Sequence, residues 1–598
     1  MSFDPEWKRG SASRASRFEM TRRRRLVAGL TAAAALLLVG RLSALVYSDY
    51  VWYSALGADG LWRERARDVF VIQMVSAVFA GLFALVNLST IRRSIISLAF
   101  PRRLGNVEFG EAVPQRQLDQ VAYILSAIVA GVMSLAAPSW ERLALVRAGS
   151  RFGETDPFFR MDLSFFTTWL PLEKSAYHWF LVLLTLVSAL VIGLYALTPS
   201  LRWQRGSFHV SVHVRRHLAV LTMLYLLMMA WSHRTDGYDL LVHGSGPGGG
   251  FSYIDHKWLI PAYLALAVGT VAAAALVLVA GWTGQIRTIF FAVSAVLIFS
   301  ITLDLVLPSV STRLGGGTAA TLREAPYEAT RAAFTRRAYG LPSVGPLAIP
   351  HEISRFDSFA DSAKLARLIG VARDSVLVYP GATGAALVQR GRGVAAPALG
   401  GGIQRIAHAW SEQRLDIAWS SYSPDTRISR RRDVGERLTA LVPAFTQGSR
   451  VVPAYLGDTL VWVVELYSAS NMYPLSKHYR LAGDVRSYFR HSATAITNSS
   501  TGRVTIVPDP NADPIAVAWR ARFPALYRAG GTDLLDELTA RAREAPAILP
   551  SVPRPETDSA FHAEITRLYA RMRGALASGN LAAFAAAYDS LGAVIGRE

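Results

Sequence analysis

Long runs of apolar residues fill the first half of the chain, and the second half has none of comparable length. Seven runs reach or approach the ~20 residues that a helix needs to cross a bilayer core of ~30 Å. They cover residues 26–47, 68–91, 119–137, 176–198, 217–232, 258–282 and 288–309. The pattern predicts an all-α membrane bundle of seven transmembrane helices over 26–309, preceded by a basic tail at 1–25.

The Lys and Arg residues between these runs predict which side of the membrane each connection faces. Eighteen of them lie in the N-terminal tail and in the second, fourth and sixth connections, whereas the remaining connections carry fewer. Cytoplasmic connections carry the excess of positive charge, so we expect the N-terminus inside and residues 310–598 outside. The expected location is the plasma (inner) membrane. An alternative stays open, because "TRRRRLVAGLTAAAALLLVG" also has the order of a secretory signal.

Residues 310–598 alternate between strand and helix patterns and predict an extracytoplasmic α+β domain. Strands are expected at 375–380, 384–390, 451–456 and 459–470, and a hairpin at 493–498 and 503–508 joined by Ser499 to Gly502. Helices are expected at 321–339, 402–418, 433–443 and 532–544. The last 40 residues predict a helical hairpin that ends the domain, broken at "SGN".

Composition narrows the chemistry that the chain can perform. It has 598 residues, 51% of them hydrophobic, and no cysteine, which excludes disulfides, thiolate nucleophiles and Cys-ligated metals. The net charge of +19 is spread over both halves, and no DNA- or RNA-binding signature accompanies it. We therefore expect no nucleic-acid partner. The basic outer domain instead suggests anionic envelope polymers or lipid headgroups as partners, besides the lipid bilayer itself.

Four stretches carry a recognisable order of motifs: "FGETDPFFRMDLSFFTTWLP", "DGYDLLVHGSGPGGGFSYIDHKWLIPA", "LREAPYEATRAAFTRRAYGL" and "YFRHSATAITNSSTGRVTIVPDPNADP". Together they resemble a family of bacterial multi-span membrane proteins known as uncharacterised protein family 0182. Order and spacing agree from about residue 20 to the end. The resemblance implies seven spans and a large extracytoplasmic domain, and it implies no known activity. The family's outer domain is usually longer, and its RHLVYTHGYG stretch is not found in this chain.

Five aspartates in two connections that face outward are candidate ligands for a divalent cation. Asp156 and Asp162 belong to the connection between runs three and four, and Asp236, Asp239 and Asp255 to the connection between runs five and six. Carboxylate oxygens suit a hard cation if the two loops meet. The alternative is that these aspartates form turns, helix caps and salt bridges, which is their usual role. On that interpretation residues 151–166 form an ordered cap with five phenylalanines inward.

Other chemistry-bearing residues give weaker indications. Arg41 and Asp304 lie at similar depth in the first and seventh runs, and intramembrane charges commonly find partners. The glycines of "GSGPGG" at 244–249 lack the strand–turn–helix context of a dinucleotide site. His209, His213 and His217 are more typical of a basic interfacial segment than of a metal site. No nucleophile elbow and no H-E-x-x-H motif occurs, so no catalytic residue and no cofactor is predicted.

Three functions remain open from the sequence. The first is an extracytoplasmic binding or scaffolding domain on a seven-helix anchor, which would not be an enzyme. The second is a transporter or channel with a regulatory outer domain, although the central parts of runs two, six and seven are nearly free of ionisable groups. The third is an envelope enzyme that acts on lipid-linked or surface polymers.

Overall fold

A computed structural model describes most of the chain. The described residues are 7–96, 115–196, 201–204, 207–303, 318–353, 376–389, 393–456, 459–527, 535–536, 538, 558–577, 583 and 587. Several predictions fall partly or wholly outside these ranges. They concern Asp304 and the end of the run at 288–309, the edges of the strands at 375–380 and 384–390, the helix at 532–544 and the second helix of the final hairpin.

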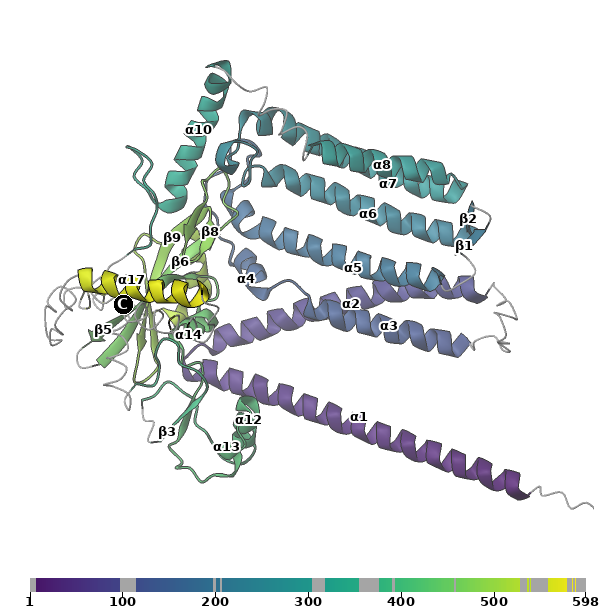
Figure 1. Cartoon of the computed structure of the whole chain (residues 1–598), viewed down its shortest axis with the longest axis horizontal. Helices are drawn as coiled ribbons and strands as arrows, with labels where there is room; N and C mark the ends of the chain where they lie inside the picture. The colour runs from purple at the N-terminus through teal and green to yellow at the C-terminus, as the bar shows by residue number, and fades with distance from the viewer. Residues whose placement is uncertain are drawn as a thin grey trace, which may run out of the picture.

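Apolar helices lie on one side of the molecule, and a sheet lies at their end (Figure 1). The helices are α1 (Trp7–Ala55), α2 (Asp59–Ile96), α3 (Gln115–Leu135), α5 (Leu170–Ala196), α6 (Val212–Asp239), α7 (Ile260–Thr283) and α8 (Ile286–Ile301). The helices α5 to α8 run nearly parallel, and α1 diverges from them. A short helix, α4 (Trp140–Ala148), follows α3. Between α5 and α6 a hairpin forms from β1 (Leu201–Gln204) and β2 (Ser207–Val210), at the end of the helices away from the sheet.

The number of helices that could cross a membrane is smaller than the seven predicted spans. In the described part of the chain five helices are long and apolar enough, or up to six if α3 and α4, bent by 58°, count as one broken span. The bend follows Pro138, whose ring cannot continue a helix. The seventh run appears as α8, which has 16 residues in the described range. The fold therefore shows membrane helices together with an α+β region, and seven spans stay a prediction.

The sheet has four antiparallel strands in the order β10-β9-β6-β5. They are β5 (Thr446–Leu456), β6 (Thr459–Ser470), β9 (Tyr488–Asn498) and β10 (Val504–Pro508). The predicted hairpin is confirmed, since Val504 pairs with Thr497 and Pro508 with Ala493 around a turn in which Gly502 has a φ of 70°. The central strands β6 and β9 bury almost every residue, because helices and loops cover both faces.

Most other elements of this region match their predictions. These are α10 (Thr318–Tyr339), β3 (Ala386–Val388), α14 (Val434–Leu441) and α17 (Asp558–Ala577). Two small two-stranded sheets are separate from the four-stranded sheet, β3 with β4 (Arg427–Ser429) and β7 (Tyr479–Leu481) with β8 (Asp484–Arg486). The helix α15 (Pro514–Arg522) packs into the core that the four-stranded sheet shares with the end of α1.

Two predictions are wrong in detail. Residues 376–380 form no strand, because the N–H groups of Leu377 and Val378 both donate to the carbonyl oxygen of Ser499, at 2.8 and 2.9 Å, instead of joining a ladder. The helix expected at 402–418 is two helices, α12 (Gly402–Glu412) and α13 (Asp416–Trp419). Gln413 adopts a left-handed conformation between them and ends the first.

Two hydrophobic clusters join the helices to the sheet region. In the first, Trp52 and Tyr53 at the end of α1 pack with Trp462 and Trp519 beneath the sheet. The Nε1 of Trp52 donates to the carbonyl of Arg430 at 3.1 Å, and the hydroxyl of Tyr53 to that of Ala440 at 2.9 Å. The second cluster joins residues 163–170 and 240–263 to α10 and to the aromatic residues of β9. The sheet region is thus fixed to the helix ends at two separate places.

Candidate functional site: an apolar crevice and the polar junction above it

The connection that carries Asp156 and Asp162 is an ordered structure, as its five phenylalanines predicted. All five are buried or half-buried, and Phe166 is completely buried. Phe152 packs against Tyr473 and Tyr488 of the sheet region, with ring centroids 6.0 and 5.7 Å apart. The loop therefore fills the space between the helix ends and the sheet.

Both aspartates of this connection are held by backbone N–H groups. Asp156 is 1% exposed and accepts from Phe158, Phe159 and Met161 at 2.9, 2.6 and 2.8 Å. Asp162 accepts from Phe152, Gly153 and Ser164 at 3.3, 3.1 and 2.8 Å. Burial raises the pKa of Asp162, but these hydrogen bonds outweigh it and hold that pKa below its ordinary value.

Asp255 has the same role in the other connection, with serines among its donors. It is completely buried and accepts from the N–H and hydroxyl groups of both Ser245 and Ser252. The glycines of 244–249 form the turn that presents Ser245. A Cβ on Gly244 would lie 2.4 Å from the carbonyl oxygen of Gly250, so the close approach requires glycine. The glycine motif therefore has a structural role, because its turn brings the donors of Ser245 to Asp255.

Asp239 and Asp236 end helix α6 and have different partners. Asp239 pairs with Lys174 at 2.7 Å and lies 3.5 Å from the Nδ1 of His243, while Asp236 accepts from the hydroxyl of Ser232 at 3.2 Å. Within the described ranges, no group of three or more His, Cys, Asp and Glu side chains is arranged to hold a metal ion. The five candidate aspartates thus lie near one junction but face separate sets of donors.

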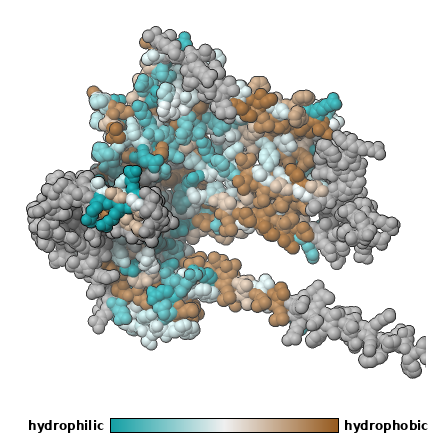
Figure 2. Space-filling model, viewed as in Figure 1, coloured by the Kyte–Doolittle hydropathy of each residue, from teal (hydrophilic) through white to brown (hydrophobic). Residues whose placement is uncertain are grey.

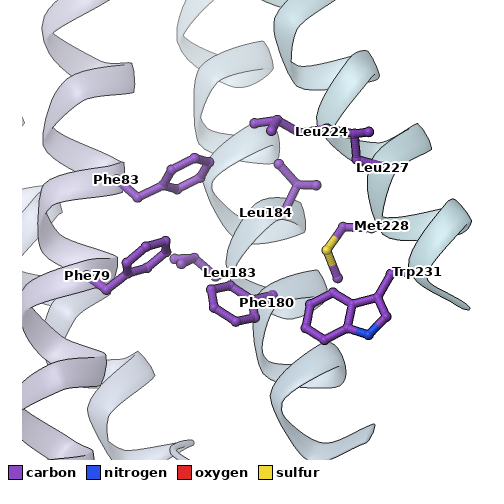
Figure 3. A pocket seen from close by; sticks show the side chains of 9 residues that line it. All are labelled: Phe79, Phe83, Phe180, Leu183, Leu184, Leu224, Leu227, Met228 and Trp231. Carbon is purple, nitrogen blue, oxygen red and sulfur yellow. The ribbon is translucent and has the colours of Figure 1, made fainter. Parts of the chain in front are cut away.

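Next to this junction, three helices leave an apolar crevice of about 210 Å³ between them (Figure 3). Its lining comes from α2, α5 and α6 and consists of Phe79, Phe83, Phe180, Leu183, Leu184, Leu224, Leu227, Met228 and Trp231. Phe79 and Leu227 are partly exposed, at 47% and 39%, so part of the crevice lining faces the surroundings of the helices. It is larger than an engineered cavity of ~150 Å³ that holds benzene, so a stretch of hydrocarbon chain can enter.

Charged residues stand at the end of the crevice nearest the sheet. The indole Nε1 of Trp231 donates to Glu173 at 2.7 Å, and Arg234 forms an ion pair with the same carboxylate. Lys174, which follows Glu173 in the chain, forms an ion pair with Asp239. Arg142 reaches the carbonyl of Pro171 at 3.3 Å from a neighbouring exposed position. An elongated molecule in the crevice would therefore have an apolar part among aromatic rings and a polar part beside Arg142 and the two ion pairs.

This polar rim continues into the sheet region. Asp239 contacts His243, and the ring of His243 stacks on that of His478 with centroids 5.0 Å apart. Burial and the neighbouring His243 lower the pKa of His478 below its ordinary value, which favours its neutral form. The N–H of Leu475 donates to the carbonyl of Leu241 at 2.6 Å beside this pair. Contacts thus run without a break from the crevice to the sheet region.

The histidines singled out in the sequence occupy different elements. His209 belongs to β2 and pairs with Arg202 in the hairpin. His213 and His217 lie on α6. The ring of His217 is hydrogen-bonded on both sides, by Nε2 to the Asn87 side chain at 2.9 Å and by Nδ1 to the Tyr195 hydroxyl at 2.8 Å. This buried network links α2, α5 and α6 at the end of the helices away from the sheet.

Of the proposed pair of Arg41 and Asp304, only Arg41 belongs to the described residues. Arg41 lies on α1, and its Nη1 atom is buried without a hydrogen-bond partner among the described residues. Asp304 lies outside those residues. The pair therefore stays a prediction.

The crevice could not be predicted from the sequence. Its lining residues are ordinary span residues on three helices that are far apart in the chain, and each run has many similar leucines and phenylalanines. One local signal was present, because Trp231 and Arg234 are one helical turn apart at the end of a run. An aromatic residue next to a cation is typical of a membrane–water boundary.

Comparison with known proteins identifies relatives but assigns no activity. A family model described as "Uncharacterised protein family (UPF0182)" matches residues 26–367 and 374–543. A UPF0182 protein of Desulforamulus reducens is 25% identical over 318 residues, which cover 50% of this chain and 34% of that protein. One of Cupriavidus necator is 29% identical over 343 residues, covering 56% of this chain and 37% of the relative.

A longer match reaches a UPF0182 protein of Nocardia farcinica, which is 21% identical over an alignment 690 positions long that covers 85% of this chain and 67% of the relative. The chain thus spans about a third of the length of the first two relatives and two thirds of the third. No solved structure matches the chain.

Proposed function

The chain belongs to the uncharacterised protein family UPF0182, and from that premise we propose that it is a seven-span protein of the bacterial plasma membrane that binds lipids or lipid-linked molecules beside an extracytoplasmic domain. The hydrocarbon chain of the ligand enters the crevice between α2, α5 and α6. Its phosphate lies at the level of Arg142 and Arg234. The sheet region acts as the binding or scaffolding domain over that ligand.

The crevice is the observation that carries this proposal. All nine of its lining side chains are apolar or aromatic, and Phe79 and Leu227 of this lining face the surroundings of the helices. Inside a bilayer, such a crevice is filled by hydrocarbon, because water in it would find no hydrogen-bonding groups. The cationic rim adds the contacts that phosphate oxygens prefer. The contacts from Asp239 to His478 give the sheet region a way to respond to an occupied crevice.

Photo-crosslinking tests the crevice directly. The purified full chain is placed in nanodiscs with a phospholipid that carries a diazirine on its acyl chain, and crosslinked residues are mapped by mass spectrometry. We expect crosslinks concentrated on the lining residues of α2, α5 and α6. Leu227→Trp fills part of the crevice and should lower these crosslinks several-fold. The matched control is Leu276→Trp, on a 47% exposed position of α7, which should leave them unchanged. Equal crosslinking in all three proteins would contradict the proposal.

Reporter fusions test the proposed orientation separately. A reporter that is active only outside the cytoplasm should work when fused after residue 320 and should fail when fused after residue 100. The reverse pattern would show that the sheet region faces the cytoplasm.

A further inference from the structure

A small lobe of the sheet region lies beside α1 rather than on the sheet. It is formed by β3, α12, α13 and β4, and we call it the α12 lobe. It has its own core, made by Leu399, Ala409, Ile417 and Ile428. In Figure 1 α12 lies against the half of α1 that is nearer the sheet, on the side away from the other membrane helices.

The α12 lobe contacts α1 inside its apolar run. The ring of Trp410 lies directly on the helix backbone, since a Cβ on Gly40 would be 2.5 Å from it. Further along α1, the hydroxyl of Ser48 is 3.2 Å from the Nδ1 of His408, and the ring of Tyr47 is 5.6 Å from that of His408. Gly40 is about 10 Å along the helix axis from the end of the apolar run at Tyr47, at 1.5 Å per residue. With the hydrocarbon boundary placed at the end of the apolar run, the lobe reaches about two helical turns below that boundary.

The α12 lobe also exposes large apolar side chains that its own core does not use. Ile403 is 85% exposed, Ile406 51%, Leu415 70% and Trp419 81%. All four belong to α12, α13 and the turn between them. The polar side chains of the same elements bond within the lobe, where Arg405 donates to the carbonyl of Ser420 at 3.1 Å and Arg414 pairs with Asp416 at 2.6 Å. An exposed apolar patch of this kind marks a surface that is covered in use.

We infer that the α12 lobe is a second membrane-contacting element, which inserts Ile403, Ile406, Leu415 and Trp419 among the acyl chains of the leaflet nearest the sheet region. Phospholipid is the occupant that the geometry favours, because the lobe is already held at hydrocarbon depth by its contact with Gly40. A short amphipathic helix with isoleucine and tryptophan on one face is typical of elements that lie in the membrane interface.

The position of α1 supports this inference. Its apolar window has no residue buried inside the structure, and in Figure 2 it is a mostly hydrophobic rod that stays separate from the other spans in this view. Lipid therefore surrounds α1, and the α12 lobe shares that surrounding. The inference does not depend on which side of the membrane the sheet region faces, nor on whether the crevice binds lipid.

Single-cysteine labelling tests the inference, because the chain has no cysteine of its own. Ile403→Cys and Trp419→Cys in the full chain are labelled with a fluorophore and placed in phosphatidylglycerol–phosphatidylethanolamine nanodiscs. Quenching is measured with nitroxide on the lipid acyl chains and with aqueous iodide. Leu38→Cys, on the exposed apolar face of α1, is the lipid-facing control, and Val344→Cys, 85% exposed in the loop after α10, is the water-facing control.

At residues 403 and 419 we expect nitroxide quenching within twofold of that at residue 38 and weak iodide quenching. Strong iodide quenching with little nitroxide quenching, as at residue 344, would overturn the inference. Weak quenching by both would also overturn it, because it would mean that a protein surface, such as a second copy, covers the patch. A melting temperature within a few degrees of the unmodified chain shows that each variant is folded.

Discussion

Two connections, residues 151–169 and 240–259, cover the sheet-side ends of the helices in similar ways with different donors. Each buries an aspartate, and each ends in a π-helical turn, at Phe165–Trp169 and at Asp255–Leu259, followed by a proline near the start of the next helix. The first satisfies Asp156 with backbone N–H groups alone. The second adds two serine hydroxyls and a glycine turn to hold Asp255.

The difference shows which hydrogen bonds fix the backbone path of each loop. A carboxylate that organises three backbone N–H groups fixes the path of its own loop, so the loss of Asp156 affects many groups at once. Asp255 ties together two segments, because Ser245 and Ser252 stand on either side of the glycine turn. Both loops also pack against each other, with the rings of Phe158 and Phe251 4.5 Å apart. Disturbing one aspartate therefore weakens the contact that both loops share.

The largest effect is expected from Asp156→Ala. The N–H groups of Phe158, Phe159 and Met161 lose their acceptor in a buried place, and such groups cost about 1–3 kcal/mol each when unsatisfied. We expect the free energy of unfolding in detergent to fall by about 3 kcal/mol or more. Asp425→Ala, at an exposed turn, is the control and should change it by less than about 0.5 kcal/mol.

The same preparations decide between the two roles considered for these aspartates. If the aspartates are structural, Asp156→Asn lowers stability and leaves the content of divalent metal unchanged. A stoichiometric metal ion that is lost from Asp156→Asn, with an unchanged melting temperature in chelator, would show that a cation site is the better interpretation.

A smaller effect is expected in the second loop from the double substitution of Ser245→Ala and Ser252→Ala. Asp255 loses its two hydroxyl donors but keeps both backbone N–H donors. The free energy of unfolding should fall by about 1–3 kcal/mol, at about 0.5–1.5 kcal/mol for each of the two hydrogen bonds lost. Ser500→Ala, in the hairpin turn of the sheet, is a serine control. A loss as large as that of Asp156→Ala would remove the proposed difference between the loops.

A matched pair of glycines sharpens the comparison. Gly153 and Gly248 have φ values of 69° and 68°, and a Cβ at either position would meet no atom within 4 Å. Substitution by alanine should therefore lower the free energy of unfolding only by the cost of a left-handed backbone with a Cβ, about 1 kcal/mol at each position. Thermal unfolding of the two variants measures this. Unequal losses would mean that one loop can relax and the other cannot.

The smallest effect concerns pH and Asp162. Its pKa is held below the ordinary value of 3.8 by hydrogen bonds, so its contribution to stability is fully present above pH 3.8. The contribution is lost as the pH falls from there through the lowered pKa. We expect Asp162→Asn to flatten the acid side of the stability profile, below about pH 4, and Asp425→Asn to leave it unchanged. Parallel acid profiles for all three proteins would contradict this role.

Much of the fold could be predicted from local pattern. The hairpin of β9 and β10, helix α10 and the strand β6 follow their expected positions closely, because alternation and turn residues act over short distances. The strand β5 ends where expected but begins at Thr446, before the expected start at Val451. The strand expected at 375–380 is absent over 376–380 because a distant contact overrides the local pattern. Its valines and leucine have strand propensity, but the carbonyl of Ser499, more than a hundred residues away, takes their N–H groups.

For the candidate site the sequence singled out the aspartates of two connections and left their roles open. Asp156, Asp162, Asp239 and Asp255 all lie at the junction of helices and sheet, as the order of the runs implied. Which donors they accept from depends on loop paths that no short motif encodes. The crevice was not predicted, since it requires that helices distant in the chain be packed together. The elements of the α12 lobe were expected in part, but its contact with α1 was not, because Trp410 and Gly40 are far apart in the chain.

The sequence by itself determined that this is a membrane protein with an α+β region after its apolar helices, because hydrophobic length and strand alternation are properties of contiguous residues. It also determined that five phenylalanines in one loop must be buried. Only the tertiary structure decided that α2, α5 and α6 leave a crevice and that Trp410 lies on Gly40. Those features depend on which side chains meet across separate elements, and that is settled by close packing of the whole chain.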